Sequence, residues 1–200
     1  VANQSYRPSI VFINGEYWGT KFIREKINEH FVASNFGVDP DSVDVIMGIE
    51  SPVEYYNEEW PIAGDLENYK ELIHWLIDHD LSDSSNYDSI TTWIDIHNFI
   101  SYQVSEIYYG NIDWPGNNMK WWRERTENGI WRWILFDVDA GMGAWEPSSY
   151  NSMLHATEED GPEQWPNPPW STFILRKLLE NQSFRDQFVM RSMDLLNTDF

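Results

Sequence analysis

The sequence predicts an α+β fold, in which a small β-hairpin portion is followed by a mostly helical lobe that carries a second, inserted β-hairpin. Two Asn-Gly pairs flanked by apolar runs indicate the hairpins, because Asn-Gly adopts the positive φ angles of a two-residue turn. Apolar residues at helical spacing dominate the other segments. The 200 residues hold no repeat and no long linker, so we expect a single domain over 1–200. The absent initiator Met and the abrupt end at Phe200 predict an excised core with both ends truncated.

The first hairpin is predicted over residues 10–13 and 16–24, with its turn at Asn14-Gly15. If the second strand continues far enough, Lys21, Ile23 and Glu25 share one face. Asn28 is expected to cap a short helix that ends at Gly37. Residues 39–50 superficially resemble a calcium loop, but they lack the glycine that such a loop needs at its sixth position.

Asp65 is expected to cap the clearest helix, whose apolar stripe comprises Tyr69, Leu72, Ile73, Leu76 and Ile77. Residues 81–88 read as a polar loop before a short helix near 89–93. Asp95 then caps a helix that Gly110 ends. The residues of this helix that we expect to face inward are Ile96, Phe99, Ile100, Val104, Ile107 and Tyr108.

The second hairpin is predicted over 119–123 and 130–136 around Asn128-Gly129, and it leads directly into Asp137-Val138-Asp139. A proline-rich loop follows over 145–169. A helix capped by Ser171 or Thr172 comes next, and Ser183 with Asp186 resembles a capping box for the last helix.

Composition narrows the functional classes. With 13 Lys and Arg against 33 Asp and Glu, the net charge of −20 repels phosphate backbones and anionic lipids, so neither a nucleic acid nor a membrane is an expected partner. The same charge suits a soluble acidic surface or a basic partner. The absence of cysteine excludes thiolate metal sites, disulfides and thiol nucleophiles. We expect most of the 12 Trp, 10 Tyr and 10 Phe to build the core.

A set of three polar residues has the order and first spacing of a protein-kinase site: Asp113, then Asn118 after four intervening residues, then Asp137 beyond a hairpin. In such a site a carboxylate accepts a hydroxyl proton, while an amide oxygen and a second carboxylate hold the divalent ion on the nucleotide phosphates. Asp, Asn and Gly are also ordinary turn residues, so a hydrogen-bonded loop is the alternative interpretation.

Several separated motifs resemble the spore-coat protein H (CotH) kinase family across nearly all of the chain. They are FINGEYWG at 12–19, IRE at 23–25, GNIDWPGNN at 110–118 and WILFDVD at 133–139, with residues 178–185 and 195–198 resembling the closing helices. The resemblance implies an atypical protein-kinase-like fold. It also implies an ATP- and Mg²⁺- or Mn²⁺-dependent enzyme that phosphorylates Ser or Thr hydroxyls of a secreted or coat protein.

The resemblance also implies roles for individual residues. Asp113 would be the catalytic Asp, and Asn118 with Asp137 would hold the metal. Asp139 is a second metal candidate, or else it caps the strand end before the Gly141 turn.

By the same resemblance Glu25 would orient a cation that binds phosphate. Arg24 and Lys21 are the cations beside it, and Lys21 has the alternative interpretation of a solvated strand residue.

Two other functions remain open. Asp-x-Asp pairs such as Asp137-Val138-Asp139 also hold the metal of nucleotide-sugar transferases, although the mainly helical chain disfavours their alternating strands and helices. The chain is alternatively a non-catalytic module that binds glycans or a surface assembly. Its aromatic platform would come from the loop tryptophans Trp60, Trp114, Trp145, Trp165 and Trp170.

Overall fold

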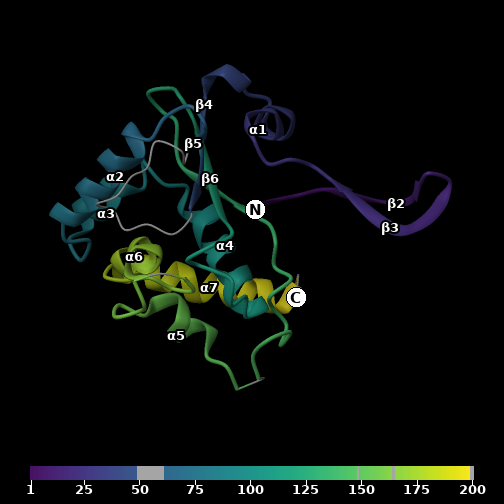
Figure 1. The fold of residues 1–200 in the computed structure, drawn as a ribbon. Coiled ribbons are helices and arrows are strands. Elements are labelled where there is room, and N and C mark those ends of the chain that lie inside the picture. The colour runs from purple at the N-terminus through teal and green to yellow at the C-terminus, as the bar shows by residue number, and fades with distance from the viewer. Residues whose placement is uncertain (49–60, 148, 164, 199–200) are drawn as a thin grey trace.

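A computed structural model describes residues 1–48, 61–147, 149–163 and 165–198, and it confirms the α+β class (Figure 1). The strands are β1 (Ala2–Asn3), β2 (Tyr6–Ile13), β3 (Glu16–Arg24), β4 (Val43–Gly48), β5 (Pro61–Ala63), β6 (Met119–Glu124) and β7 (Arg132–Leu135). The helices are α1 (Glu29–Phe36), the 3₁₀ turn η1 (Pro40–Ser42), α2 (Glu67–Asp78), α3 (Ser84–Ile90), α4 (Ile96–Tyr109), α5 (Ser152–Thr157), α6 (Pro169–Leu178) and α7 (Gln182–Thr198). No helix in the described part of the chain is long and apolar enough to cross a membrane.

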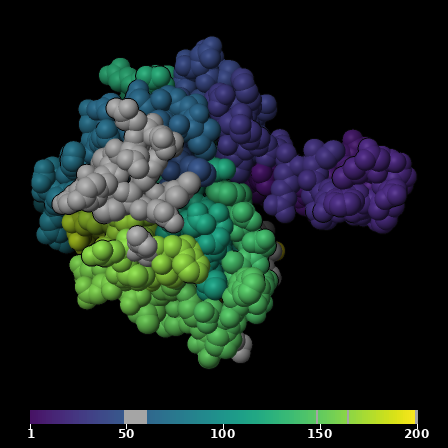
Figure 2. Space-filling model, in the orientation of Figure 1, coloured from purple at the N-terminus to yellow at the C-terminus, as the bar shows by residue number. Residues whose placement is uncertain are grey.

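Strands β2 and β3 form the predicted first hairpin, with Asn14 and Gly15 both at positive φ in its turn. This β2–β3 hairpin, called the ribbon below, starts at Tyr6, earlier than expected. Strand β3 ends at Arg24, so Glu25 lies just beyond it. The ribbon projects away from the body, as Figures 1 and 2 show, and only its base lies near the rest of the molecule.

The second hairpin, β6 and β7, forms as predicted, but it is the centre of a five-stranded sheet rather than an isolated insertion. The strand order is β1-β7-β6-β4-β5, in which β1 runs parallel to β7 and the other pairs are antiparallel. Strand β4 was not predicted because its apolar run is short and is interrupted by Asp44. The sheet fixes Asp137 and Asp139 just beyond the end of β7.

Asp44 is fully buried in β4 and is neutralised by charge pairs. Its Oδ2 lies 2.9 Å from Nε of Arg123 on β6, and its Oδ1 lies 3.5 Å from Nε of Arg125. The Asp65 backbone N–H also donates to Oδ1 over 3.0 Å. Gly64 is required beside this cluster, because it has a φ of +73° and a Cβ there would lie 2.2 Å from Oδ1 of Asp44.

The predicted caps of α1 and α4 are confirmed. The Asn28 side chain accepts from the Phe31 N–H, and the Asp95 side chain accepts from the Asn98 N–H, while Gly37 and Gly110 end the two helices in the left-handed region. Leu66 rather than Asp65 occupies the N-cap position of α2, but the Asp65 side chain accepts from the Glu67 N–H over 3.0 Å, as the predicted cap requires.

Three helical predictions between residues 77 and 108 were wrong. The segment 81–88 is not a loop throughout, because Asp83 caps α3 from Ser84 to Ile90. This helix begins five residues before the predicted start at 89 and ends three residues before the predicted end at 93. Ile77 and Tyr108 extend the apolar stripes in sequence but are exposed, since each stripe covers only the part of its helix that contacts the core.

The C-terminal third also differs from expectation. The proline-rich segment contains α5, which the Asn151 side chain caps. Helix α6 begins at Pro169, before Ser171 and Thr172, because proline is well suited to the first helical turn. Asn181, rather than Ser183 with Asp186, caps α7 by accepting from the backbone N–H groups of Ser183 and Phe184.

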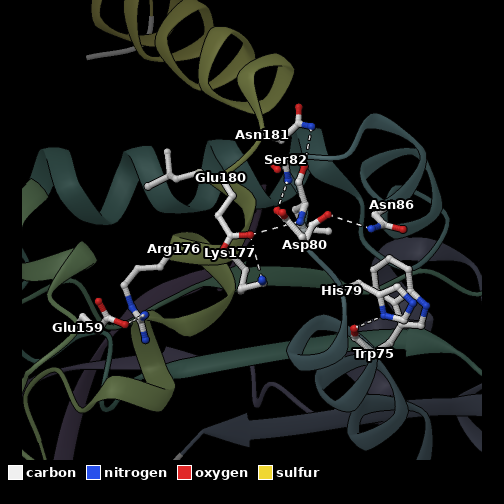
Figure 3. Close-up of polar contacts among 12 residues, drawn as sticks. Trp75, His79, Asp80, Ser82, Asn86, Glu159, Arg176, Lys177, Glu180 and Asn181 are labelled. Atoms are coloured by element: carbon white, nitrogen blue, oxygen red, sulfur yellow. Dashed lines mark hydrogen bonds and ion pairs between the residues drawn. The ribbon is translucent and has the colours of Figure 1, made fainter.

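The same Asn181 joins α7 to the loop after α2, in the region that Figure 3 shows. Its Nδ2 donates to the Leu81 carbonyl over 2.8 Å, and Glu180 accepts from the Leu81 N–H and pairs with Lys177. These contacts connect the first and last helices of the helical lobe around its main core. That core contains the buried rings of Trp114, Trp121, Trp131 and Trp133, which confirms core use for these aromatics.

Candidate active site

The loop between α4 and β6 holds Asp113 in a dense set of hydrogen bonds. Asn118 donates from Nδ2 to Oδ2 of Asp113 over 2.7 Å, and Asn117 donates from Nδ2 to Oδ1 over 3.2 Å. Trp165, 52 residues further along the chain, donates from Nε1 to the same Oδ1 over 2.7 Å. A carboxylate offers about four acceptor positions. Asp113 is therefore fixed by three donors and keeps room for one more.

Asn111 connects this loop to the end of β7. Its Oδ1 accepts from the Asp113 N–H over 3.2 Å, and its Nδ2 lies 3.4 Å from the Asp137 carbonyl oxygen. The Asn111 side chain is almost fully buried. Asn111 thus connects Asp113, which Asn118 contacts, to the backbone at Asp137, and the roles of these three residues stay predictions.

Asp137 and Asn118 both hold the left-handed backbone conformation, each with a φ of 55°. Non-glycine residues rarely adopt this conformation, and where they do the surrounding structure must impose it. Burial raises the pKa of Asp137, and the neighbouring carboxylates of Asp139 and Asp113 raise it further, whereas Arg24 and Lys120 oppose the shift. Three acidic side chains therefore share one neighbourhood, which favours a bound cation.

Two cavities meet at Asp139. One has a volume of about 440 Å³, and its lining includes Arg24 and Tyr6 at the ribbon base together with Asp137 and Asp139. The other, of about 480 Å³, is lined by Ile112, Asp113, Asp139, Ala140, Ala144, Trp145 and Trp165. Asp113 thus faces one cavity and Asp137 the other, with Asp139 common to both.

The structure separates the three residues predicted to bind nucleotide. Arg24 lines the cavity that contains Asp137. Lys21 is exposed on β3, opposite Ser9, and is not among the residues that line this cavity. Glu25 lies at the ribbon base, where its Oε2 accepts from the Ser5 N–H over 2.9 Å. The roles of all three stay predictions.

The donor set fits a magnesium or manganese ion that is bound together with a nucleotide. Among the described residues, no three His, Asp or Glu side chains already form a metal cluster. Mg²⁺, however, is usually held by one or two carboxylates with the remaining oxygens from substrate phosphates and water. Because the Asp113 carboxylate only accepts, Asn118 must turn its amide nitrogen toward it, which leaves the amide oxygen of Asn118 as a potential metal ligand.

The segment after α5 braces the loop from the opposite side. His155 donates from Nε2 to the Trp114 carbonyl over 2.6 Å, and burial lowers the pKa of this imidazole. The Gly116 N–H donates to the Pro166 carbonyl over 2.7 Å, and a Cβ on Gly116 would lie 2.7 Å from that same oxygen. Glycine is therefore needed at this contact.

The tryptophans proposed as a binding platform divide into different environments. Trp114 is buried and cannot serve as a surface platform, whereas Trp145 and Trp165 are 76% and 47% exposed beside the Asp113 cavity. Trp170 is half-buried at the start of α6. Trp60 lies outside the described residues.

Sequence reasoning missed Asn111, Asn117, Lys120 and Glu106, and it named Trp165 as a possible binding platform without its contact to Asp113. The first two lie inside the recognised GNIDWPGNN motif but carried no assigned role. Lys120 lies beside the site, with Nζ 4.4 Å from the ring centre of Phe136. Glu106 had a detectable signal, because an acid four residues after Tyr102 and seven after Phe99 falls on the buried face of α4.

Comparison with known protein families identifies the class of this chain. The family model described as CotH kinase protein matches residues 1–200, the whole chain. The chain belongs to the CotH kinase family. No curated protein matches it. Membership in this family supports a kinase-like function of the phosphotransferase class.

Proposed function

We propose that this chain transfers the γ-phosphoryl group of ATP to a Ser or Thr hydroxyl of a protein, with Mg²⁺ or Mn²⁺ as cofactor. The observation that carries the proposal is the pair of cavities that meet at Asp139, one containing Asp137 and Arg24 and the other containing Asp113. A phosphoryl transfer needs donor and acceptor on opposite sides of one reacting phosphorus. The two cavities offer such an arrangement.

In this proposal the ATP phosphates lie in the cavity of Asp137 and Arg24. Asp137, Asp139 and the amide oxygen of Asn118 hold the divalent ion, which when bound neutralises charge on the phosphates. Arg24 supplies a guanidinium that can donate to phosphate oxygens. The positive charge of the divalent ion would also reduce the repulsion among the Asp137, Asp139 and Asp113 carboxylates.

The acceptor hydroxyl lies in the cavity of Asp113, Trp145 and Trp165. Asp113 accepts the hydroxyl proton through the acceptor position that its three donors leave open. The hydroxyl oxygen then bonds to the γ-phosphorus while the bond from that phosphorus to the β-γ bridging oxygen breaks, and ADP leaves. The net charge of −20 favours a basic acceptor protein through long-range attraction. A secreted or coat protein is the acceptor class that the family resemblance suggests.

Phosphate transfer to a peptide tests the proposal. The chain is incubated with γ-labelled ATP, Mg²⁺ or Mn²⁺, and a basic Ser-containing peptide, and a peptide with Ala in place of Ser is the acceptor control. We expect label only in the Ser peptide, and its loss in both Asp113→Asn and Asp137→Ala. Equal labelling by the parent chain and Asp137→Ala would refute the proposal. Stabilisation by polysaccharide without any response to metal and nucleotide would instead favour a glycan-binding module.

A further inference from the structure

Glu106 is a buried acid in α4 for which the proposed reaction has no use. It is 0% exposed. No Lys or Arg forms an ion pair with it in the described part of the chain. Burying an acid without a cation is costly, so such a residue is retained only where its hydrogen bonds serve a purpose.

The hydrogen bonds of Glu106 lead to Asn111. Oε2 of Glu106 accepts from Nδ2 of Asn111 over 2.9 Å, and the Glu106 carbonyl accepts from the Asn111 N–H over 3.3 Å. Asn111 in turn contacts the Asp113 N–H through Oδ1 and the Asp137 carbonyl through Nδ2. Glu106 is thus connected, through Asn111 alone, to both the Asp113 loop and the end of β7.

The acid determines which way the Asn111 amide faces. An oxygen of the Glu106 carboxyl group accepts from Nδ2, and this leaves Oδ1 of Asn111 directed at the Asp113 N–H. If the amide turned over, its nitrogen would meet that N–H, and two donors would face each other. Glu106, together with the Asp113 N–H, therefore holds Asn111 in the orientation that joins the Asp113 loop to the end of β7.

We propose that Glu106 is a positioning residue that acts through Asn111 to fix Asp113 and Asp137 relative to each other. The inference rests on the proposed function only in one respect: phosphoryl transfer is the reason why Asp113 and Asp137 need a fixed arrangement. Glu106 touches neither the acceptor nor the metal in this account. Removing its acceptor oxygens should loosen residues 111–118 and the end of β7 together, whereas a neutral side chain that keeps an acceptor oxygen should preserve them.

Three variants of α4 provide the test. Glu106→Leu removes both oxygens at similar size, and Glu106→Gln keeps one acceptor for Asn111. Gln103→Leu is the matched control, since Gln103 is a buried polar residue of the same helix, and within the described part of the chain its Oε1 has no hydrogen-bond partner. Amide hydrogen exchange without metal or nucleotide reports on the loop, and titration with Mn²⁺ and ATP reports on the metal site.

We expect Glu106→Leu to accelerate exchange at the Asp113 amide and to weaken Mn²⁺ binding about 10- to 100-fold, as removal of a supporting residue typically does. Glu106→Gln should restore both to near the parent values, and Gln103→Leu should change neither. Unchanged exchange and affinity in Glu106→Leu would overturn the inference, as would equal loosening by the control or failure of Gln to rescue.

If Glu106→Leu does not fold, Asn111→Ser replaces it, because the shorter hydroxyl cannot bridge the same three groups. Normal exchange at Asp113 and normal Mn²⁺ affinity in that variant would likewise overturn the inference. If the parent chain binds no metal with ATP, the proposed function fails. The exchange measurement still decides the positioning role in that case.

Discussion

Asn118 donates from its side-chain amide to Oδ2 of Asp113 over 2.7 Å, so the predicted metal ligand and the predicted catalytic Asp are linked before any substrate binds. The link orients both groups: Asp113 is held by a donor, and the Asn118 oxygen is directed away from it. Preorganisation of this kind lowers the cost of assembling a site at the moment of reaction.

Loss of the Asn118 side chain should weaken metal binding more than loss of the Asn117 side chain. Asn118→Gly removes the amide and tolerates the φ of 55°, so it avoids the backbone strain that Ala would introduce. We expect Mn²⁺ in the presence of ATP to bind at least about tenfold more weakly, since one metal ligand is lost. The control Asn117→Ala removes a different donor to Asp113 and should have a smaller effect. Equal affinity in Asn118→Gly and the parent would show that Asn118 is not a ligand.

Arg24 and Lys21 should differ in nucleotide binding. Arg24 lines the Asp137 cavity, whereas Lys21 does not. A hydrogen bond to a charged group contributes about 1.5–3 kcal/mol, so Arg24→Ala should raise the dissociation constant for ATP about tenfold or more. Lys21→Ala should leave it within about twofold. Calorimetric titration with ATP and Mg²⁺ measures both, and a larger loss in Lys21→Ala would reverse the assignment.

The buried Asp44 cluster should dominate the stability of the sheet. Asp44→Asn leaves Arg123 without its buried counter-charge, and breaking a buried pair in this way costs about 3–5 kcal/mol. Asp65→Asn is the control, because its pair with Arg125 is half-exposed and should contribute less than about 1 kcal/mol. Urea unfolding of the three proteins measures the difference. Equal losses in the two variants would contradict the ranking.

Glu106 should give the unfolding free energy a characteristic pH dependence. Burial raises its pKa from 4.5 to about 8, so the native chain retains a proton that the unfolded chain releases. The stabilisation from this proton is complete below pH 4.5 and is lost as the pH rises toward 8.

Between those limits the stability difference between the parent and Glu106→Gln should change by about 1.4 kcal/mol per pH unit, with the parent losing stability as pH rises. Urea unfolding at several pH values from about 5 to 7.5 measures this slope. The lowered pKa of His155 makes the unfolding free energy rise with pH, but it does so equally in both proteins and cancels in the difference. A difference that does not vary with pH would show that Glu106 titrates normally.

The sequence predicted those features that depend on local geometry. Both hairpins follow from Asn-Gly turns, and the ends of α1 and α4 follow from Asn28, Asp95 and their glycines. The kinase-like spacing of Asp113 and Asn118 was equally local. Such features need only neighbouring residues, so a sequence can display them.

Features that depend on distant partners were missed. Strand β4 contains a buried acid that looks unsuited to a core until Arg123 and Arg125 are placed beside it. Trp165 reaches Asp113 across 52 positions, and nothing in its own segment indicates that contact. Asn181 displaced the predicted capping box because it also bonds to Leu81, a tertiary contact that local capping rules do not include.

The most direct test of the account is to ask which backbone amides a bound Mn²⁺ ion reaches, by paramagnetic broadening of the amide resonances with a non-hydrolysable ATP analogue present. The account predicts that sub-stoichiometric Mn²⁺ broadens residues 112–118 and residues 136–140 together, and that Asp137→Ala abolishes both effects. Broadening confined to one of these segments, or persisting unchanged in Asp137→Ala, would contradict a single metal site shared by Asp113's loop and the end of β7.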